Sequence, residues 1–235
     1  MAGPAALQEL PAPKQWELRA ARRGGGRPVE GGRPFANEII DAAWALVQDD
    51  ENLEFTVKQV TERAGVALQT FYRYFGNKDE LLLAMFEESM RAATARFLDV
   101  ATADPVDHLR HLVTEPILME FDERAQRVVR WRGRERQRLL EFFPDAVEAV
   151  YEPYRAAIAE AIAAACRAGA GTCEAPDVDA TIILHLVQEM AHGVHGGGID
   201  HPPRLVAERV WHLVRAGLAA GSTPEAGERR RRSRR

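Results

Sequence analysis

Hydrophobic residues along this chain follow the spacing of α-helices from Pro34 to about residue 220. They recur every three or four positions, which is the period of a helix that buries one face, and the alternation typical of strands does not appear. The pattern therefore predicts an all-α fold of about nine helices. The expected helices begin at Pro34 and then cover 56–64, 67–75, 77–100, 105–120, 122–140, 144–168, 177–195 and 203–219.

Two of these helices are short and closely spaced, at 56–64 and 67–75. Thr56 is placed to cap the first one, because its hydroxyl can accept a hydrogen bond from an exposed backbone N–H of the first turn. Gly65 ends that helix, since glycine adopts the left-handed conformation that other residues avoid. Helix, glycine turn and helix form the helix-turn-helix arrangement that many proteins use to read DNA.

The second short helix carries side chains suited to DNA. Gln69 can pair bidentately with adenine, and the methyl group of Thr70 can pack on the thymine methyl. Hydroxyl and cationic side chains beside them suit phosphate contacts, which fix the register of a protein on DNA without reading sequence. The predicted DNA-contacting residues are Thr56, Lys58, Leu68, Gln69, Thr70, Tyr72, Arg73, Tyr74 and Lys78. The alternative is an ordinary helical hairpin with surface tyrosines.

The string AGVALQTFYRYFGNKDELL, residues 64–82, resembles the recognition-helix signature of the tetracycline-repressor (TetR) family of bacterial transcriptional regulators. The resemblance in motif covers roughly 34–90. Two departures, Ala67 where a Ser-like cap is usual and Val60-Thr61 where Ile-Ala is usual, bear on local stability and remove no DNA-facing residue. The matching features are Ala64-Gly65-Val66, Thr70, Tyr72, Phe75, Lys78, Asp79-Glu80 and Leu81-Leu82.

The same pattern divides the chain into parts. Residues 34–80 are the expected DNA-binding domain, and 81–220 the expected ligand-binding and dimerisation domain. The helix at 77–100 joins the two and is the natural lever between them. Residues 1–33 and 221–235 are rich in arginine and poor in large apolar residues, so we expect a disordered basic arm and a disordered basic tail that add non-specific DNA affinity.

Composition narrows the class of protein. With 235 residues and a formal net charge of −4, the chain is not a globally basic nucleic-acid binder, so DNA affinity must come from local contacts. No apolar run approaches the length of a membrane span, and we expect no membrane association. Cys166 and Cys173 lie close in sequence and could form a bridge, but reduced thiols of a cytoplasmic protein are the favoured interpretation.

The last predicted helix is apolar on more than one side, which is more than a surface helix needs. Pairing 177–195 and 203–219 with their copies would give a four-helix bundle with two-fold symmetry. A homodimer of this kind places two recognition helices about 34 Å apart, one turn of DNA, and requires a near-palindromic double-stranded operator. The alternative is a monomer that buries both faces internally.

In proteins of the TetR family the C-terminal helices form a pocket for a small molecule. An aromatic residue at helical spacing is more often part of the core, so the individual assignments are candidates only. Arginines occupy every second position from 130 to 138, and on a helix this spacing distributes them over both sides. Most of them are expected to be solvated or paired. One or two are candidates to bind an acidic ligand. The candidate ligand-binding residues are Phe121, Trp131, Phe142, Tyr151, His185, Glu189 and His192.

His185, Glu189 and His192 share one face of their predicted helix, opposite an apolar stripe. Such side chains can bind a divalent metal, but their spacing differs from that of a zinc-protease motif. Polar pocket lining or a hydrated or interface face is therefore favoured, and no metal site is predicted.

Together these features predict a ligand-responsive DNA-binding regulator, with repression and release by an effector favoured by the resemblance. No catalytic residues and no cofactor are predicted. The alternatives are a metal-sensing regulator and a helical metallohydrolase that uses the His185, Glu189 and His192 face.

Overall fold

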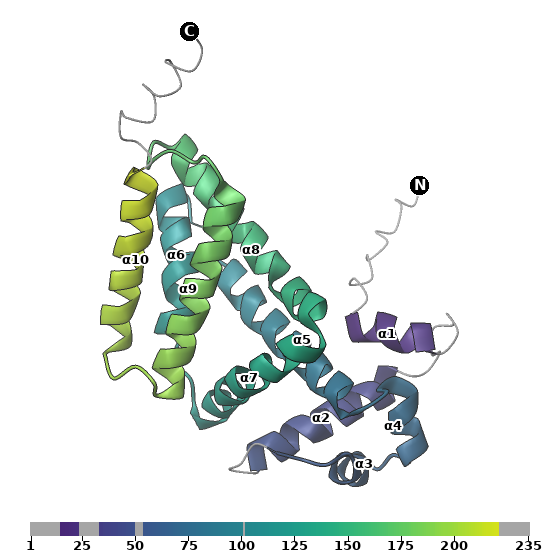
Figure 1. Cartoon of the computed structure of the whole chain (residues 1–235). Helices are drawn as coiled ribbons and strands as arrows, with labels where there is room; N and C mark the ends of the chain where they lie inside the picture. Colours follow the sequence, from purple (N-terminus) through teal and green to yellow (C-terminus); the bar gives the residue numbers. More distant parts are fainter. Residues whose placement is uncertain (1–14, 24–32, 50–53, 101, 221–235) are drawn as a thin grey trace, which may run out of the picture.

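The computed structural model describes residues 15–23, 33–49, 54–100 and 102–220, and within these residues it contains ten α-helices and no strand (Figure 1). The all-α prediction is confirmed, and each of the nine expected helices is present with its ends shifted by a few residues at most. The helices are α1 (Gln15–Arg23), α2 (Arg33–Asp49), α3 (Val57–Ala64), α4 (Leu68–Tyr74), α5 (Lys78–Leu98), α6 (Pro105–Leu118), α7 (Glu123–Phe142), α8 (Pro144–Arg167), α9 (Pro176–Gly196) and α10 (Pro203–Ala220).

Helices α2, α3 and α4 form a small unit with its own packed interior. Ile39 and Ala43 of α2, Val60 of α3 and Phe71 of α4 are fully buried, because the helical period brings each to the inner side of its helix. Phe75, just after α4, joins the same core. The three helices therefore depend on one another for burial of their apolar faces.

Helix α1 was not predicted, and it corrects the expectation that the whole of 1–33 is a disordered arm. Trp16 is buried, its ring lies 6.1 Å from that of Phe75 between centroids, and its Nε1 donates to Glu88 at 3.1 Å. Arg19 forms an ion pair with buried Glu87 at 2.7 Å, so this arginine contacts α5 instead of serving as part of a DNA-binding arm. Burial raises the pKa of Glu87, and Arg19 partly offsets that rise. The other residues of the predicted arm and the tail at 221–235 lie outside the described residues.

Helix α5 extends from the small unit into the rest of the molecule (Figure 1). Asn77 caps it, with its Oδ1 accepting from the N–H of Glu80 at 2.9 Å. Leu81 and Met85 at its start are fully buried, and Phe97 near its end is also buried. The predicted boundary at residue 80 falls inside this helix, so the division of the chain there stays a prediction.

The remaining helices pack around the far end of α5. Helices α6, α8, α9 and α10 form a bundle, and α7 crosses between this bundle and α2 (Figure 1). Tyr154 of α8 donates its hydroxyl to the carbonyl oxygen of Leu112 in α6, and Arg110 of α6 pairs with Glu208 of α10 at 2.6 Å. None of the helices among the described residues combines the length and the apolar character needed to cross a membrane.

Helix α8 continues from Pro144 to Arg167 with Pro153 inside it. One local expectation is wrong. Cys166 and Cys173 are joined by a disulfide and are not reduced thiols. The turn after α8 brings their Cα atoms to 6.2 Å, which is within the range that a disulfide spans.

Candidate functional site

The turn between α3 and α4 has the geometry that its residues predict. Thr56 and Gln59 form a reciprocal capping box, in which the N–H of Gln59 donates to the Thr56 hydroxyl at 3.2 Å and the N–H of Thr56 donates to Gln59 Oε1 at 2.8 Å. Gly65 has φ 67°, in the left-handed region. The N–H of Val66 then donates to the carbonyl oxygen of Thr61 at 3.1 Å, which closes the end of α3 and fixes the direction of α4.

Helix α4 presents a mixed apolar and polar ridge to solvent. Leu68, Gln69 and Arg73 are exposed, and Tyr72 is 49% exposed. Phe71 on the other side anchors the helix in the core and packs edge-on against the Tyr72 ring, with centroids 5.3 Å apart. The ridge is therefore held by a rigid support, while its outer side chains remain accessible to a partner.

The other predicted DNA-contacting residues differ in how exposed their side chains are. Thr56 and Lys58 are exposed, and Thr70 is half-buried. Lys78 is half-buried with its ammonium 4.9 Å from the ring centroid of Phe55, which holds this cation near the start of α5. The prediction that Tyr74 contacts DNA is corrected, because its side chain is only 2% exposed and belongs to the core.

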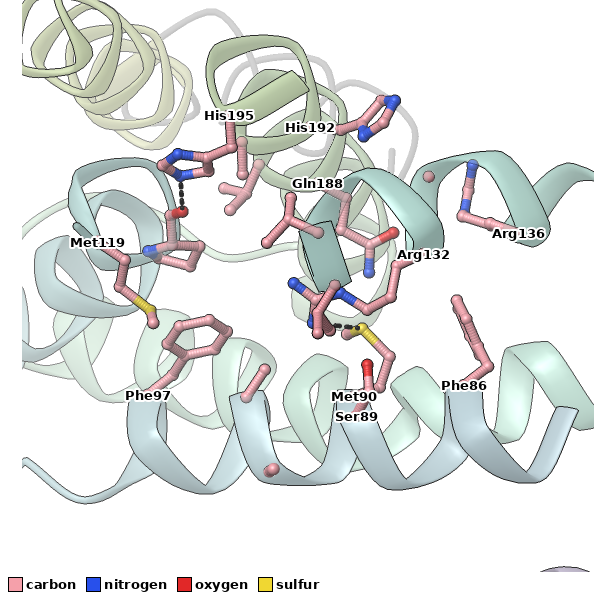
Figure 2. Close-up of a pocket in the computed structure, with 18 of the residues that line it drawn as sticks. Phe86, Ser89, Met90, Phe97, Met119, Arg132, Arg136, Gln188, His192 and His195 are labelled. Atoms are coloured by element: carbon pink, nitrogen blue, oxygen red, sulfur yellow. Dashed lines mark hydrogen bonds between the residues drawn. The ribbon is translucent and has the colours of Figure 1, made fainter. Parts of the chain in front are cut away.

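A second feature is a cavity of about 480 Å³ between α5, α6, α7, α8 and α9 (Figure 2). Its wall is mostly apolar, with Phe86, Met90 and Phe97 from α5, Met119 after α6 and Val129 from α7. This volume lies within the range of about 300–1,000 Å³ that is common for small-molecule sites.

Four of the seven candidate ligand-binding residues line this cavity: Phe121, Tyr151, Glu189 and His192. The prediction is corrected for the other three, which do not line the cavity. Trp131 is fully buried against Trp44 of α2, with ring centroids 4.8 Å apart, so it joins α7 to the helix-turn-helix unit. Phe142 and His185 are exposed and lie outside the cavity wall.

Helix α7 has two faces with different contacts. Its arginines, which recur at every second position from 130 to 138, are divided between these faces. Val129, Arg132, Gly133 and Arg136, at helical spacing, face the cavity. On the other side Arg127 donates to the carbonyl oxygen of Gln48, Arg134 lies 3.9 Å from a carboxylate oxygen of Glu54, and Arg138 pairs with Asp79 at 2.5 Å. The i, i+3, i+4, i+7 spacing from Val129 was a signal in the sequence that could have identified Arg132 and Arg136 as cavity residues.

Several polar residues of the cavity have perturbed acid–base properties. Burial lowers the pKa of Arg132, and nearby Tyr151 only partly offsets this. Burial raises the pKa of Tyr151 against the opposing effects of Arg136 and Arg132. Burial also lowers the pKa of His195, whose Nε2 lies 3.0 Å from the carbonyl oxygen of Pro116.

The histidine and glutamate face of α9 is not assembled as a metal site. His185 Nδ1 lies 2.8 Å from the carbonyl oxygen of Thr181, and Glu189 pairs with Arg136 at 3.2 Å. His192 packs over Gly133, where a side chain on that glycine would overlap the imidazole. In the part of the chain that the structure describes, no group of three His, Cys, Asp or Glu residues has the arrangement needed to hold a metal ion.

These features define a helix-turn-helix unit joined to a second, cavity-containing helical part. Residues 39–85 match the family model described as "Bacterial regulatory proteins, tetR family". The resemblance seen in the sequence is confirmed over these residues, which include α3 and α4.

A curated relative is similar over a short stretch of sequence. The fatty acid metabolism regulator protein of Bacillus subtilis (strain 168) is 38% identical over 58 residues, which are 25% of this chain and 30% of that protein. The match thus spans less than a third of the relative's length.

Solved structures extend the likeness to the whole fold. A putative TetR-family transcriptional regulator from Rhodococcus sp. has a TM-score of 0.60 at 18% identity, covering 79% of this chain and 100% of that one. FadR from Bacillus subtilis in complex with stearoyl-CoA has a TM-score of 0.58 at 20% identity, covering 77% and 98%. At these identities the likeness establishes the fold alone.

Proposed function

We propose that this protein is a ligand-responsive transcriptional regulator that binds an operator through α4 and is released from it by a small molecule in the cavity. The observation that carries the proposal is the exposed ridge of α4, held by a capped turn within a domain that matches the TetR family model. Repression is the favoured direction of control. The proposal describes a cytoplasmic protein that is not an enzyme.

The exposed residues of α4 have distinct roles in this proposal. Gln69 and Thr70, in the first turn of the helix, read base edges in the major groove. Tyr72, Arg73 and Lys78 contact phosphates and set the register on the duplex. Leu68 packs on sugar or thymine methyl groups, and Thr56 and Lys58 reach the backbone from the start of α3.

A two-fold dimer places two copies of α4 on one operator. Support for it comes from exposed apolar side chains on α9 and α10, helices that lie side by side at the end of the molecule away from α3 and α4 (Figure 1). Ile182 is 60% exposed and Leu213 is 61% exposed, and both line a shallow hollow between the two helices. Val178 of α9 and Leu205 of α10 are also exposed apolar side chains.

Two helices connect the cavity with the DNA-binding unit. Helix α5 lines the cavity through Met90 and Phe97 and packs in the N-terminal core through Leu81. Helix α7 lines the cavity on one face and contacts α2 through Trp131 on the other. A ligand that binds one arrangement of these helices more tightly shifts the equilibrium toward it, and a coupling of about 1–3 kcal/mol is typical.

The solved relative that holds stearoyl-CoA supports a small-molecule effector in a fold of this kind. For this chain the mostly apolar wall of the cavity supports a ligand with a substantial hydrocarbon part.

The proposal is tested by selecting bound sequences from a random duplex library and then measuring affinity by fluorescence anisotropy. We expect a near-palindromic site with half-sites about one helical turn apart. Gln69→Ala should weaken binding by about 1–3 kcal/mol and relax the preference at one base pair. Arg73→Ala should weaken binding similarly for all sequences and reduce the salt slope by about one.

Arg91→Ala is the matched control, because Arg91 is an exposed arginine on α5 outside the proposed interface. It should leave affinity unchanged. Thermal melting must show that all variants are folded. Operator affinity that survives Gln69→Ala, Tyr72→Ala and Arg73→Ala alike would refute the proposed role of α4.

A further inference from the structure

The cavity wall has an excess of positive charge, although the whole chain is net negative. It contains Arg96, Arg132 and Arg136 but a single carboxylate, that of Glu189. Glu189 accepts from Arg136 at 3.2 Å, so the charge of Arg136 is balanced within the protein. The remaining positive charge favours an anionic ligand, because charges interact more strongly in a poorly hydrated space than in water.

Arg132 is the cation set deepest in this wall. Its Nη1 lies 3.4 Å from the sulfur of Met90, which is a weak acceptor, and none of the described carboxylates forms an ion pair with it. Burial lowers its pKa, but a guanidinium remains protonated at neutral pH. Since buried charges are normally paired, Arg132 has donors left for an anionic group of a ligand.

Two neutral donors accompany this cation. Gln188 Nε2 and Ser89 Oγ are buried, and neither has a hydrogen-bond partner among the described residues. Figure 2 shows the side chains of Arg132, Gln188 and Ser89 extending into the same part of the cavity, from three different helices. One unpaired cation with two neutral donors matches a singly charged group that only accepts hydrogen bonds, which is the character of a carboxylate.

The rest of the wall supplies an apolar compartment next to this polar group. Phe97, Met119 and Val129 are buried and line the cavity, and Phe121 adds a further aromatic surface. A ligand that fills this compartment therefore needs a hydrocarbon part attached to its charged end.

On the basis of the proposed function, we propose that the effector is an amphiphilic organic acid. Its carboxylate pairs with Arg132 and accepts hydrogen bonds from Gln188 and Ser89, while its hydrocarbon part packs against Phe97 and Met119. A doubly charged phosphate fits less well, because Arg136 is already neutralised by Glu189 and Arg96 is exposed.

The test is isothermal titration of the full chain with straight-chain acids from octanoate to tetradecanoate, below their micelle concentrations. Decanol and decyltrimethylammonium serve as neutral and cationic probes matched to decanoate. We expect an acid of this series to bind, with decanoate at least tenfold tighter than decanol. The Arg132→Met variant should lose about 10- to 100-fold in affinity for the acid and keep its affinity for decanol, as charge-assisted hydrogen bonds are worth about 1.5–3 kcal/mol.

Two further variants sharpen this result. Arg130→Met removes an exposed arginine of the same helix that does not line the cavity, and it should bind the acid like the original chain. Gln188→Glu places a carboxylate beside Arg132 and should abolish acid binding while sparing decanol. The ligand class is overturned if no acid binds, if decanoate and decanol bind equally, or if Arg132→Met leaves acid affinity unchanged.

Operator binding measured with and without the acid keeps the two proposals separate. Acid that binds through Arg132 but leaves operator affinity unchanged would refute the regulatory role of the cavity and leave its ligand class standing. An operator released by a neutral or cationic compound alone would overturn the ligand class and leave the regulatory role standing.

Discussion

His195 links α9 to α6 through a single ring nitrogen. Its Nε2 lies 3.0 Å from the carbonyl oxygen of Pro116, and its ring packs edge-on against Phe121 with centroids 4.7 Å apart. Burial lowers the pKa of His195, nearby Arg132 lowers it further, and the Pro116 carbonyl only partly offsets these effects. The imidazole is therefore neutral near pH 7 and donates to Pro116 through Nε2.

The pH dependence of stability follows from this environment. In the unfolded chain His195 takes up a proton near pH 6.5, while the folded state does so only at lower pH, so stability present above pH 6.5 is lost as the pH falls toward the folded pKa. A single such group changes the free energy of unfolding by up to about 1.4 kcal/mol per pH unit. Denaturant unfolding between pH 7.5 and 5.5 should show a shallower loss of stability for His195→Gln than for the original chain.

His185→Gln is the matched control for that measurement, because His185 lies on the exposed side of the same helix. It should retain the steeper loss of stability. A slope in His195→Gln equal to that of the original chain would show that the imidazole does not titrate differently in the folded state.

Individual residues show where prediction from sequence stops. Gln69 and Tyr72 are predicted to be exposed and are, because the helical period and the glycine turn are local properties. Tyr74 follows exposed Arg73 and has a polar hydroxyl, yet it is buried, because α4 packs against α1 and α2. Arg132 and Arg134 are the same residue type two positions apart: the helical spacing from Val129 separates their faces, but the packing of α7 decides which face lines the cavity.

At the scale of elements, α1 illustrates a helix stabilised by tertiary contacts. Its sequence, QWELRAARR, has few apolar residues, and those that matter are Trp16 and Ala20, which bury against the α4 and α5 region. The other nine helices were predictable because their apolar periodicity lies within each segment. The disulfide between Cys166 and Cys173 was not, because it depends on how the turn after α8 folds back.

The role of α1 can be tested by Trp16→Ala. Loss of the contacts with Phe75 and Glu88 should release α1 and lower stability by up to about 3 kcal/mol, the lower end of the range for removing a buried tryptophan. Hydrogen–deuterium exchange should then show loss of protection in α1 and faster exchange in α4. Leu18→Ala, at an exposed position of α1, should leave both unchanged, and protected α1 amides in Trp16→Ala would contradict the assigned anchor.

At the scale of the whole molecule, the proposed dimer depends on the apolar surface of α9 and α10. Replacing Ile182 and Leu213 together by glutamate should convert a dimer to a monomer, since it places charge on both faces of the interface. Light scattering coupled to size exclusion measures the mass directly. Operator affinity should fall with the loss of the second α4.

Phe142→Glu is the control for this pair, because Phe142 is an exposed apolar residue on α7. The Phe142→Glu variant should still have the mass of a dimer in the light-scattering measurement. A dimer that persists in the Ile182→Glu, Leu213→Glu variant would place the interface elsewhere.

The buried side chains from Trp16 to Leu218 form one uninterrupted hydrophobic cluster, and α5 contributes to it along most of its length. If the cavity is re-engineered to make a biosensor, substitutions that change ligand binding will therefore also change DNA binding. A library built on Phe86 or Met90 should be sorted for basal promoter leakage before it is sorted for response to a new inducer.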